Sequence, residues 1–162
     1  MAITKGDTLP GATLVAMGTD GPEQISLQDR LDGRKVVIFA VPGAFTPTCS
    51  SAHVPSFVRV KDDLAAKGVD EIICLSVNDP FVLSAWGERT GATEAGITLL
   101  GDPESAFTKA IGMDFTAPPA GLIARSKRYA MLVEDGVVTL LHAEASPGEC
   151  DISAGESLLD AM

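Results

Sequence analysis

Three cysteines are the residues of this 162-residue chain that could carry redox or nucleophilic chemistry: Cys49, Cys74 and Cys150. An odd, low count of this kind is not typical of a disulfide framework. In a reducing compartment such cysteines are structural, metal-binding or catalytic. Their local surroundings decide between these three roles.

Cys49 stands where a loop with two prolines, PGAFTPTC, leads into a predicted helix that runs to Ala66. Free N–H groups and the helix dipole favour an anion there, and a thiolate is the nucleophilic form of cysteine. The hydroxyl of Thr46 can donate to that thiolate and accept from a protonated peroxide, while Pro42 and Pro47 stiffen the loop. These features are what a thiol peroxidase needs. The alternative is a buried structural thiol, because free cysteine is among the most buried residue types.

Two histidines offer weaker possibilities. His53 follows Cys49 by four residues, so the two share a helix face, as a general base or half of a metal pair would. No further cluster of cysteine and histidine supports zinc binding, and Pro55 should kink or split this helix. We therefore expect His53 to be a packed histidine and His142 to be structural.

The apolar pattern predicts an α/β protein. Buried strands are expected over residues 35–41, 71–77 and 97–101, and crossover helices between them imply that they are parallel. A β-hairpin and a final helix follow. This order predicts a thioredoxin-like fold, in which helices cover both faces of a mixed central sheet. Sites in such sheets lie beyond the carboxyl ends of the parallel strands, where the Cys49 loop begins.

Turn and capping signals set further boundaries. Asp79-Pro80 should open a helix through Trp86, and Gly68 suits the end of the helix before it. The remaining expectations are a helix from Asp102-Pro103 to Gly112, a loop over 113–124, strands 129–133 and 137–141 joined by Asp135-Gly136, and a capping box at 153–156.

The charge and composition of the chain exclude some classes of binding partner. The net charge is −10, which argues against binding to nucleic acid or to anionic lipid. Hydrophobic residues make up 46% of the chain, enough for one folded domain over residues 1–162. The opening MAITKGDTLPG resembles neither a secretory nor a transit peptide, so we expect a cytoplasmic protein.

The segment from Pro42 to Cys49 resembles the active-site signature of the peroxiredoxins. The resemblance to the type II (type-five-like) subfamily runs from about Gly6 to the C-terminus, and it is carried by the strings VPGAFTPTCS, HVPSF, VDEIICLSVNDPFV, AWG and RSKRYAMLVEDG. It implies a thioredoxin-like fold and an antioxidant peroxidase without cofactor or metal. It also implies that Cys49 reduces hydrogen peroxide and organic hydroperoxides through a sulfenic acid.

The same resemblance implies roles for three further residues: Pro42 shields Cys49, Thr46 hydrogen-bonds it and Arg128 completes the site. Physically, a guanidinium at the edge of a buried sheet needs an anionic partner or water. The alternative is a hairpin arginine with a solvated head, beside Arg125 and Lys127. The residues alone do not choose Arg128 over Lys127, since both neighbour apolar faces.

Two other functions compete with the peroxidase. A thiol–disulfide oxidoreductase on this fold would carry Cys-x-x-Cys, and Thr46 stands where its first cysteine would be. A redox-sensing interaction protein, in which oxidation of Cys49 changes assembly, stays open as an added role.

Cys74 and Cys150 are candidate resolving cysteines. Cys74 lies within a predicted strand, where a thiol is buried and inert, although it matches a cysteine that some type II relatives use. Cys150 lies in a loop beside Glu149 and Asp151, which should raise its pKa. Its position is similar to that of the resolving cysteine of the animal-type relatives, but the flanking residues match poorly.

We therefore expect an external thiol to reduce the Cys49 sulfenic acid: glutathione, glutaredoxin or thioredoxin. A homodimer is also expected. The family implies dimers through the region of the active site, where Phe45 and Phe81 could be exposed on one rim.

Overall fold

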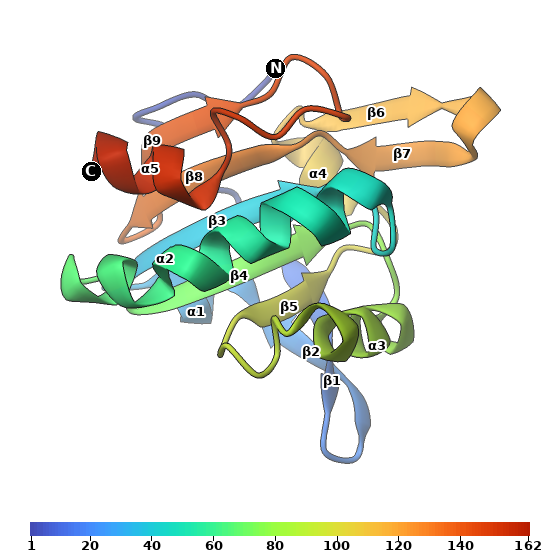
Figure 1. Cartoon of the computed structure of the whole chain (residues 1–162), viewed down its shortest axis with the longest axis horizontal. Helices are drawn as coiled ribbons and strands as arrows, with labels where there is room; N and C mark the ends of the chain where they lie inside the picture. Colours follow the sequence, from blue (N-terminus) through green and yellow to red (C-terminus); the bar gives the residue numbers. More distant parts are fainter.

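The computed structural model describes residues 1–162 and is built around a seven-stranded mixed sheet in the order β2-β1-β5-β4-β3-β8-β9 (Figure 1). Its strands are β1 Thr13–Gly18, β2 Gly21–Ser26, β3 Lys35–Val41, β4 Glu71–Ser76, β5 Thr98–Gly101, β8 Tyr129–Glu134 and β9 Val137–Ala143. A separate hairpin pairs β6 Asp114–Ala117 with β7 Leu122–Ser126. The helices are α1 Leu27–Leu31, α2 Val54–Ala66, α3 Pro80–Thr90, α4 Ala106–Ala110 and α5 Gly155–Ala161, with a π-helix at Cys49–His53 and a 3₁₀ turn at Pro118–Ala120.

The centre of the sheet confirms the predicted α/β topology. Strands β3, β4 and β5 are parallel, and β8 lies antiparallel beside β3 with Ala40 opposite Tyr129. Because β8 runs the other way, the residues just before it lie at the same edge as the residues just after β3. That edge receives the Cys49 loop, as the strand order predicted.

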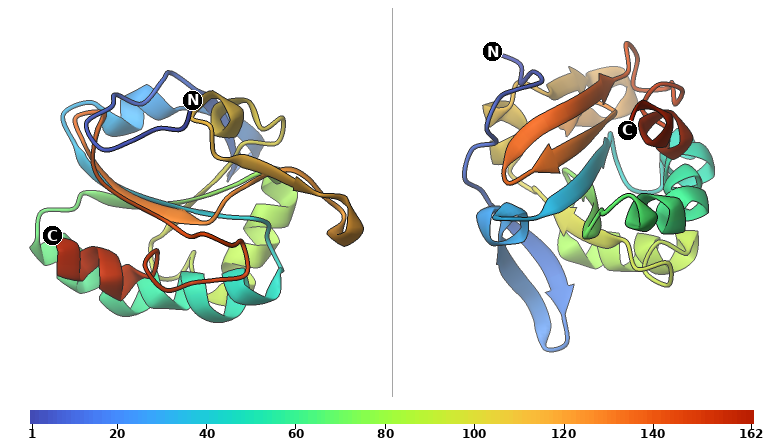
Figure 2. Two further views of the ribbon diagram at one scale, coloured as in Figure 1. Left: turned by 90° about the horizontal axis from the view of Figure 1, so that it is seen from above. Right: turned by 90° about the vertical axis from the view of Figure 1, so that its left-hand side faces the viewer.

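Helices cover both faces of the sheet, each over its own hydrophobic cluster (Figure 2). One face packs Leu27 and Leu31 of α1 and Phe107 of α4. The other packs α2, α3 and α5, and its cluster includes Cys49 and Cys74. Buried residues such as Ile38 and Phe39 point to opposite faces from successive positions of β3, so this strand is apolar throughout. No helix is both long enough and apolar enough to cross a membrane.

Several boundaries differ from the sequence-based predictions. The β1–β2 hairpin and α1 were not predicted, because only Leu14 of β1 is fully buried and β2 is a polar edge strand. The expected loop over 113–124 is wrong: it contains β6 and the start of β7, which pair with each other and project from the body (Figure 1). Helix α3 extends beyond Trp86 to Thr90.

Two predicted helix starts are also wrong. Helix α4 begins at Ala106 rather than at Asp102-Pro103, yet the Asp102 carboxylate still accepts from the backbone N–H of Phe107 and Thr108. Helix α5 has no side-chain cap, so the 153–156 capping box does not form. The Ser153 hydroxyl instead donates to Glu144, because a tertiary acceptor competes successfully with the local one.

Other local signals are confirmed. Asp79 caps α3 by accepting from Val82 N–H at 2.9 Å. Gly68 follows α2 with a φ of 89°. The Asp135-Gly136 turn joins β8 and β9 with φ values of 49° and 79°, the pair of positive angles that a tight hairpin requires.

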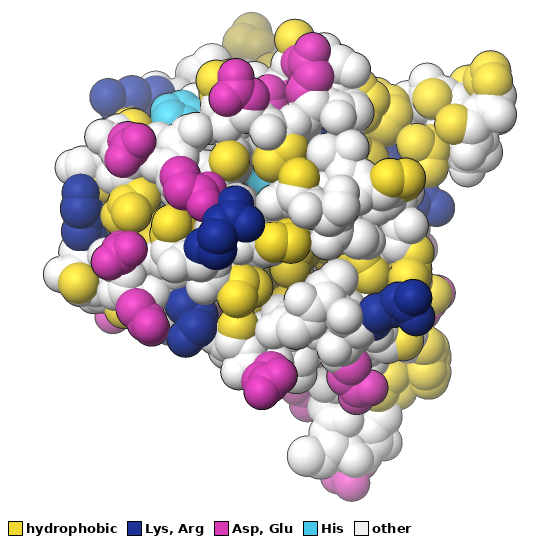
Figure 3. Space-filling model, viewed as in Figure 1, with side chains coloured by type: hydrophobic (Ala, Val, Ile, Leu, Met, Phe, Trp, Pro, Cys, Tyr) yellow, Lys and Arg dark blue, Asp and Glu magenta, His cyan; other side chains and the backbone are white.

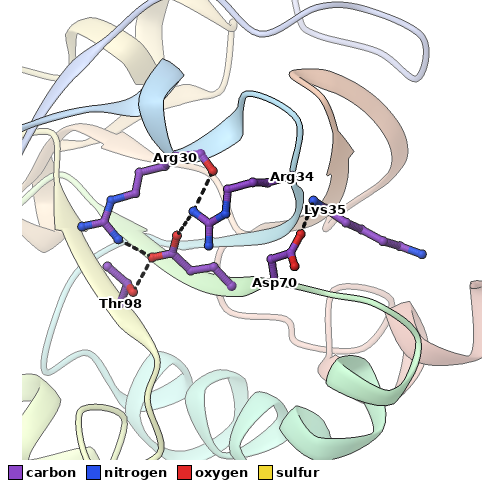
Figure 4. A network of polar contacts seen from close by, with 6 residues as sticks. Arg30, Arg34, Lys35, Asp70 and Thr98 are labelled. Atoms are coloured by element: carbon purple, nitrogen blue, oxygen red, sulfur yellow. Dashed lines mark hydrogen bonds and ion pairs between the residues drawn. The ribbon is translucent and has the colours of Figure 1, made fainter.

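A charged cluster holds the edge of the sheet opposite the Cys49 loop (Figure 4). The carboxylate of Glu71, at the start of β4, pairs with Arg30 at 2.6 Å and with Arg34 at 2.9 Å. The Thr98 hydroxyl donates to the same carboxylate at 2.6 Å. The Glu71 side chain is 7% exposed, while the two arginine side chains are about one third exposed. This nearly buried carboxylate therefore connects α1 and the residues after it to strands β4 and β5.

We predict that Glu71→Ala lowers the free energy of unfolding by about 2 kcal/mol, because it removes charge-assisted hydrogen bonds at a nearly buried position. Urea unfolding measures this loss. The matched control is Asp62→Ala, which removes an exposed partner of Lys61 and should change stability by less than about 0.5 kcal/mol. Equal losses in the two variants would contradict the structural role of the cluster.

Candidate active site

Cys49 opens a short π-helix rather than a continuous α-helix. The N–H of Val54 donates to the carbonyl of Cys49, five residues back, and α2 begins at Val54. Pro55 lacks an N–H and suits the first turn of a helix, so it marks the start of α2 and leaves the preceding turn wide. The predicted split at Pro55 is confirmed, and it separates Cys49 from the regular helix.

The Cys49 side chain is fully buried, beside a pocket that its two hydrogen-bond partners help to line. Its sulfur lies 2.7 Å from Thr46 Oγ1 and 3.0 Å from Arg128 Nη2. Thr46 Oγ1 also lies 2.8 Å from the Gly43 carbonyl. With one hydrogen for two acceptors, this hydroxyl can donate to a thiolate, or turn to Gly43 and accept from a protonated partner.

Arg128 is the cation of this site. It is 1% exposed, and its three kinds of N–H group have separate acceptors: the Cys49 sulfur, Nδ1 of His53 at 3.0 Å and the Pro147 carbonyl at 3.1 Å. The alternative of a solvated arginine is therefore wrong. Lys127 is the exposed member of the pair.

His53 is buried, as expected, but its contact with Arg128 was not predicted. Its Nε2–H donates to the Ser153 carbonyl at 3.0 Å, which leaves Nδ1 as the acceptor for Arg128. Burial, and after it the charge of Arg128, lowers the pKa of His53 to about 3. The imidazole is thus neutral at ordinary pH. No group of three metal-ligating side chains exists here or elsewhere in the chain.

Pro42 and the β6–β7 hairpin complete the pocket above Cys49. The pocket has a volume of about 190 Å³ and is lined by Pro42, Thr46, Leu122, Arg128 and Pro147, among others. Leu122 comes from the hairpin, along which hydrophobic atoms are visible in Figure 3.

The Pro42 carbonyl accepts from Arg125 Nη1 at 3.3 Å. The same nitrogen would lie 2.5 Å from a Cβ at Gly43, so a larger residue there would displace the Arg125 guanidinium. The sequence singled out neither contact, because each depends on how close β7 comes to the end of β3.

The other two cysteines lie apart from this set of hydrogen bonds, and all three are free thiols. Cys74 pairs with Phe39 in the sheet and is fully buried, which raises the pKa of its thiol well above the ordinary value. Cys150 is half-buried between β9 and α5, and its pKa is also raised. The direction agrees with the prediction, but the cause is burial first rather than Glu149 and Asp151.

Comparison with known proteins agrees with this geometry. The Redoxin family model matches residues 4–159. Peroxiredoxin-2E-2, chloroplastic, of Oryza sativa subsp. japonica is 46% identical over 164 residues, covering 99% of this chain and 72% of its own. Peroxiredoxin-2C of Arabidopsis thaliana is 40% identical over 161 residues, covering 99% and 98%. The crystal structure of reduced Prx3 from Vibrio vulnificus in complex with hydrogen peroxide superposes with a TM-score of 0.91 at 46% identity, covering 98% of each chain.

The class of protein is therefore a thioredoxin-like peroxidase that works through thiol chemistry. Within that class, the chain belongs to the peroxiredoxins, in the type II, type-five-like subfamily.

The low pKa of His53 predicts acid sensitivity. An unfolded histidine has a pKa near 6.5, so between that value and about 3 the unfolded chain binds a proton that the folded chain excludes. Stability must fall as the pH falls through this window, by about 2 kcal/mol at pH 5 from this residue. His53→Asn keeps a side-chain acceptor for Arg128 without a titrating ring.

Urea unfolding at pH 7 and pH 5 tests this. The wild type should lose more stability between the two pH values than His53→Asn does. Equal losses would mean that His53 is not buried in its neutral form.

Proposed function

We propose that Cys49 is the nucleophile with which this peroxidase reduces hydrogen peroxide and organic hydroperoxides. The observation that carries the proposal is that Thr46 and Arg128 both lie at hydrogen-bond distance from one buried sulfur, beneath a pocket that opens outward. Pro42 and Pro147 line that pocket, and the sulfur itself is fully buried. The complex of Prx3 with hydrogen peroxide, in a relative of 46% identity, supports the same substrate class.

The chemistry follows from the donors around the sulfur. The Cys49 thiolate attacks the terminal oxygen of the hydroperoxide, an S–O bond forms and the O–O bond breaks. Cys49 becomes a sulfenic acid, and the departing oxygen takes up a proton and leaves as water or alcohol. Arg128 is placed to stabilise negative charge on the oxygens during this transfer, and the Thr46 hydroxyl can accept from the peroxide O–H.

Cys49→Ser should abolish peroxide reduction, and Arg128→Ala should slow it by about 10²- to 10³-fold, the range seen when a preorganised donor is removed. Arg128→Ala should also slow alkylation of Cys49 at pH 7, since the donor that contacts the sulfur is lost. Stopped-flow kinetics and alkylation rates at this fixed pH measure the two effects. The matched control is Lys127→Ala, which removes the exposed neighbouring cation. Turnover by Cys49→Ser would rule out the proposed nucleophile.

The regeneration step uses, in our proposal, an external thiol: glutathione with or without glutaredoxin, or thioredoxin. Cys74 and Cys150 both have raised pKa values, which lowers the thiolate fraction available to attack a sulfenic acid. The incoming thiol forms a mixed disulfide with Cys49 and releases water. A second thiol then restores the Cys49 thiolate and leaves as the disulfide of the reductant.

The double variant Cys74→Ser/Cys150→Ser should therefore keep most of its turnover with glutathione and glutaredoxin. Steady-state assays of the double and single variants, with mass spectrometry of the oxidised wild type, test this. Loss of turnover in Cys150→Ser alone, together with a Cys49–Cys150 disulfide, would instead establish an intramolecular cycle.

We also propose a homodimer through the face that carries Phe45 and Phe81. These side chains are 51% and 63% exposed, which is unusual for phenylalanine in a chain with only six. Phe45 shares a surface cleft with Trp86 and Arg89 of α3, and Phe81 lies in the first turn of the same helix. An interface here would cover both rings beside the active site.

Sedimentation velocity at tens of micromolar should show a dimer, and Phe81→Glu should shift it toward monomer because a charge cannot be buried there without a partner. Ile152→Glu, at an exposed apolar residue near the C-terminus, is the control and should stay dimeric. A wild type that sediments only as a monomer would exclude a stable dimer.

A further inference from the structure

The segment Glu144–Ser153 joins β9 to α5 and contacts the active site through its backbone. The Pro147 carbonyl accepts from Arg128 Nε at 3.1 Å, and the Ser153 carbonyl accepts from His53 Nε2 at 3.0 Å. We call this segment the clamp. It supplies one hydrogen-bond acceptor to Arg128 and another to His53, whose Nδ1 accepts from Arg128.

The clamp also reaches the chain just before the nucleophile. The Thr48 hydroxyl donates to the Gly148 carbonyl at 3.1 Å. The middle of the clamp, residues 145–149, is exposed and contains neither helix nor strand. Regular secondary structure therefore does not hold these carbonyls in place, and some other interaction has to.

The Glu144 side chain connects the two ends of the clamp by hydrogen bonds. Oε1 of Glu144 accepts from Asp151 N–H at 2.6 Å, and from both the N–H and the hydroxyl of Ser153 at 2.8 Å each. The N–H of Glu144 itself donates to the Arg128 carbonyl at 2.9 Å, which anchors the carboxylate beside the site. Burial disfavours the charged carboxylate, but these hydrogen bonds outweigh it and lower the pKa of Glu144.

We propose that Glu144 is a positioning residue of the peroxidase site. Its carboxylate fixes the conformation of the clamp. In that conformation the Pro147 carbonyl accepts from Arg128 directly, and the Ser153 carbonyl orients His53, which accepts from Arg128 in turn. Arg128 is thereby held beside Cys49. The proposal rests on the proposed role of Cys49 as the nucleophile.

The effect on chemistry is indirect but has to pass through Arg128. This guanidinium is buried, so a donor that loses its acceptor either stays unpaired at a cost or turns toward another partner. A guanidinium that turns moves the Nη2 group that contacts the Cys49 sulfur at 3.0 Å. Displacements of about 1 Å at a reacting centre are enough to slow catalysis by about 100-fold.

The test uses the full chain in a Cys74→Ser/Cys150→Ser background, so that alkylation reports Cys49 alone. Glu144→Ala should lower the rate constant for peroxide reduction by about 10- to 100-fold. It should also slow alkylation of Cys49 at pH 7, because Arg128 is no longer held at hydrogen-bond distance from the sulfur. A thermal melt of each variant establishes that the protein is folded at the assay temperature.

Two matched variants separate positioning from other effects. Glu144→Gln keeps an oxygen at the position of Oε1 and should recover most of the rate of peroxide reduction and of the rate of Cys49 alkylation. Glu149→Ala removes a carboxylate from an exposed position of the same clamp whose side chain makes no hydrogen bond, and should leave both readouts unchanged.

The proposal is overturned if Glu144→Ala keeps the parental rates of peroxide reduction and of Cys49 alkylation, or if only its melting temperature falls. It is also overturned if Glu149→Ala causes the same losses, which would indicate a general effect of charge. Should Glu144→Ala be unfolded, Ser153→Ala removes one of the three donors, and its effect should have the same direction and be smaller. A Ser153→Ala variant with unchanged rates would also contradict the proposed role of Glu144.

Cys49→Ser, assayed beside these variants, keeps the two proposals apart. Turnover in that variant would end the proposed role of Cys49. A normal rate in Glu144→Ala, with no turnover in Cys49→Ser, would end only the role of Glu144.

Discussion

The guanidinium of Arg128 is placed inside the protein, where its charge and its N–H groups need partners from the protein itself. The Cys49 sulfur, the His53 imidazole and the Pro147 carbonyl supply them. Each partner is constrained in turn. His53 has to stay neutral to accept from Arg128, and its own burial ensures that it does. When Cys49 is ionised, the thiolate and the guanidinium offset each other's charge in a region that water does not reach.

The sheet brings these groups together from distant parts of the chain. Because β3 and β8 are antiparallel neighbours, the loop after Val41 and the residue before Tyr129 leave the sheet at the same edge. The π-helix then turns both Cys49 and His53 toward Arg128. A regular α-helix would turn the chain by a different angle over the same residues, so the position of Pro55 contributes to the geometry of the site.

Complete burial of Cys49 bears on how large a molecule can meet its sulfur. The pocket lined by Thr46 and Arg128 has a volume of about 190 Å³, which a small hydroperoxide fits, whereas glutathione or a protein is too large for it. The segment around Cys49 is suited to a local rearrangement, because Phe45 has a φ of 67° and the π-helix has looser hydrogen bonding than an α-helix.

Local patterns in the sequence determined the elements with strong periodicity or unambiguous turns: the buried strands, the Asp135-Gly136 hairpin and the break at Pro55. The motif around Cys49 predicted that Thr46, three residues earlier, would hydrogen-bond its sulfur, and the two atoms lie 2.7 Å apart. Contacts over long separations were beyond sequence reasoning, because Lys127 and Arg128 are chemically similar neighbours and only the register of β8 with β3 turns Arg128 inward. For the same reason Ser153 was assigned to a local cap, when its hydroxyl meets Glu144 only once β9 and α5 have folded together.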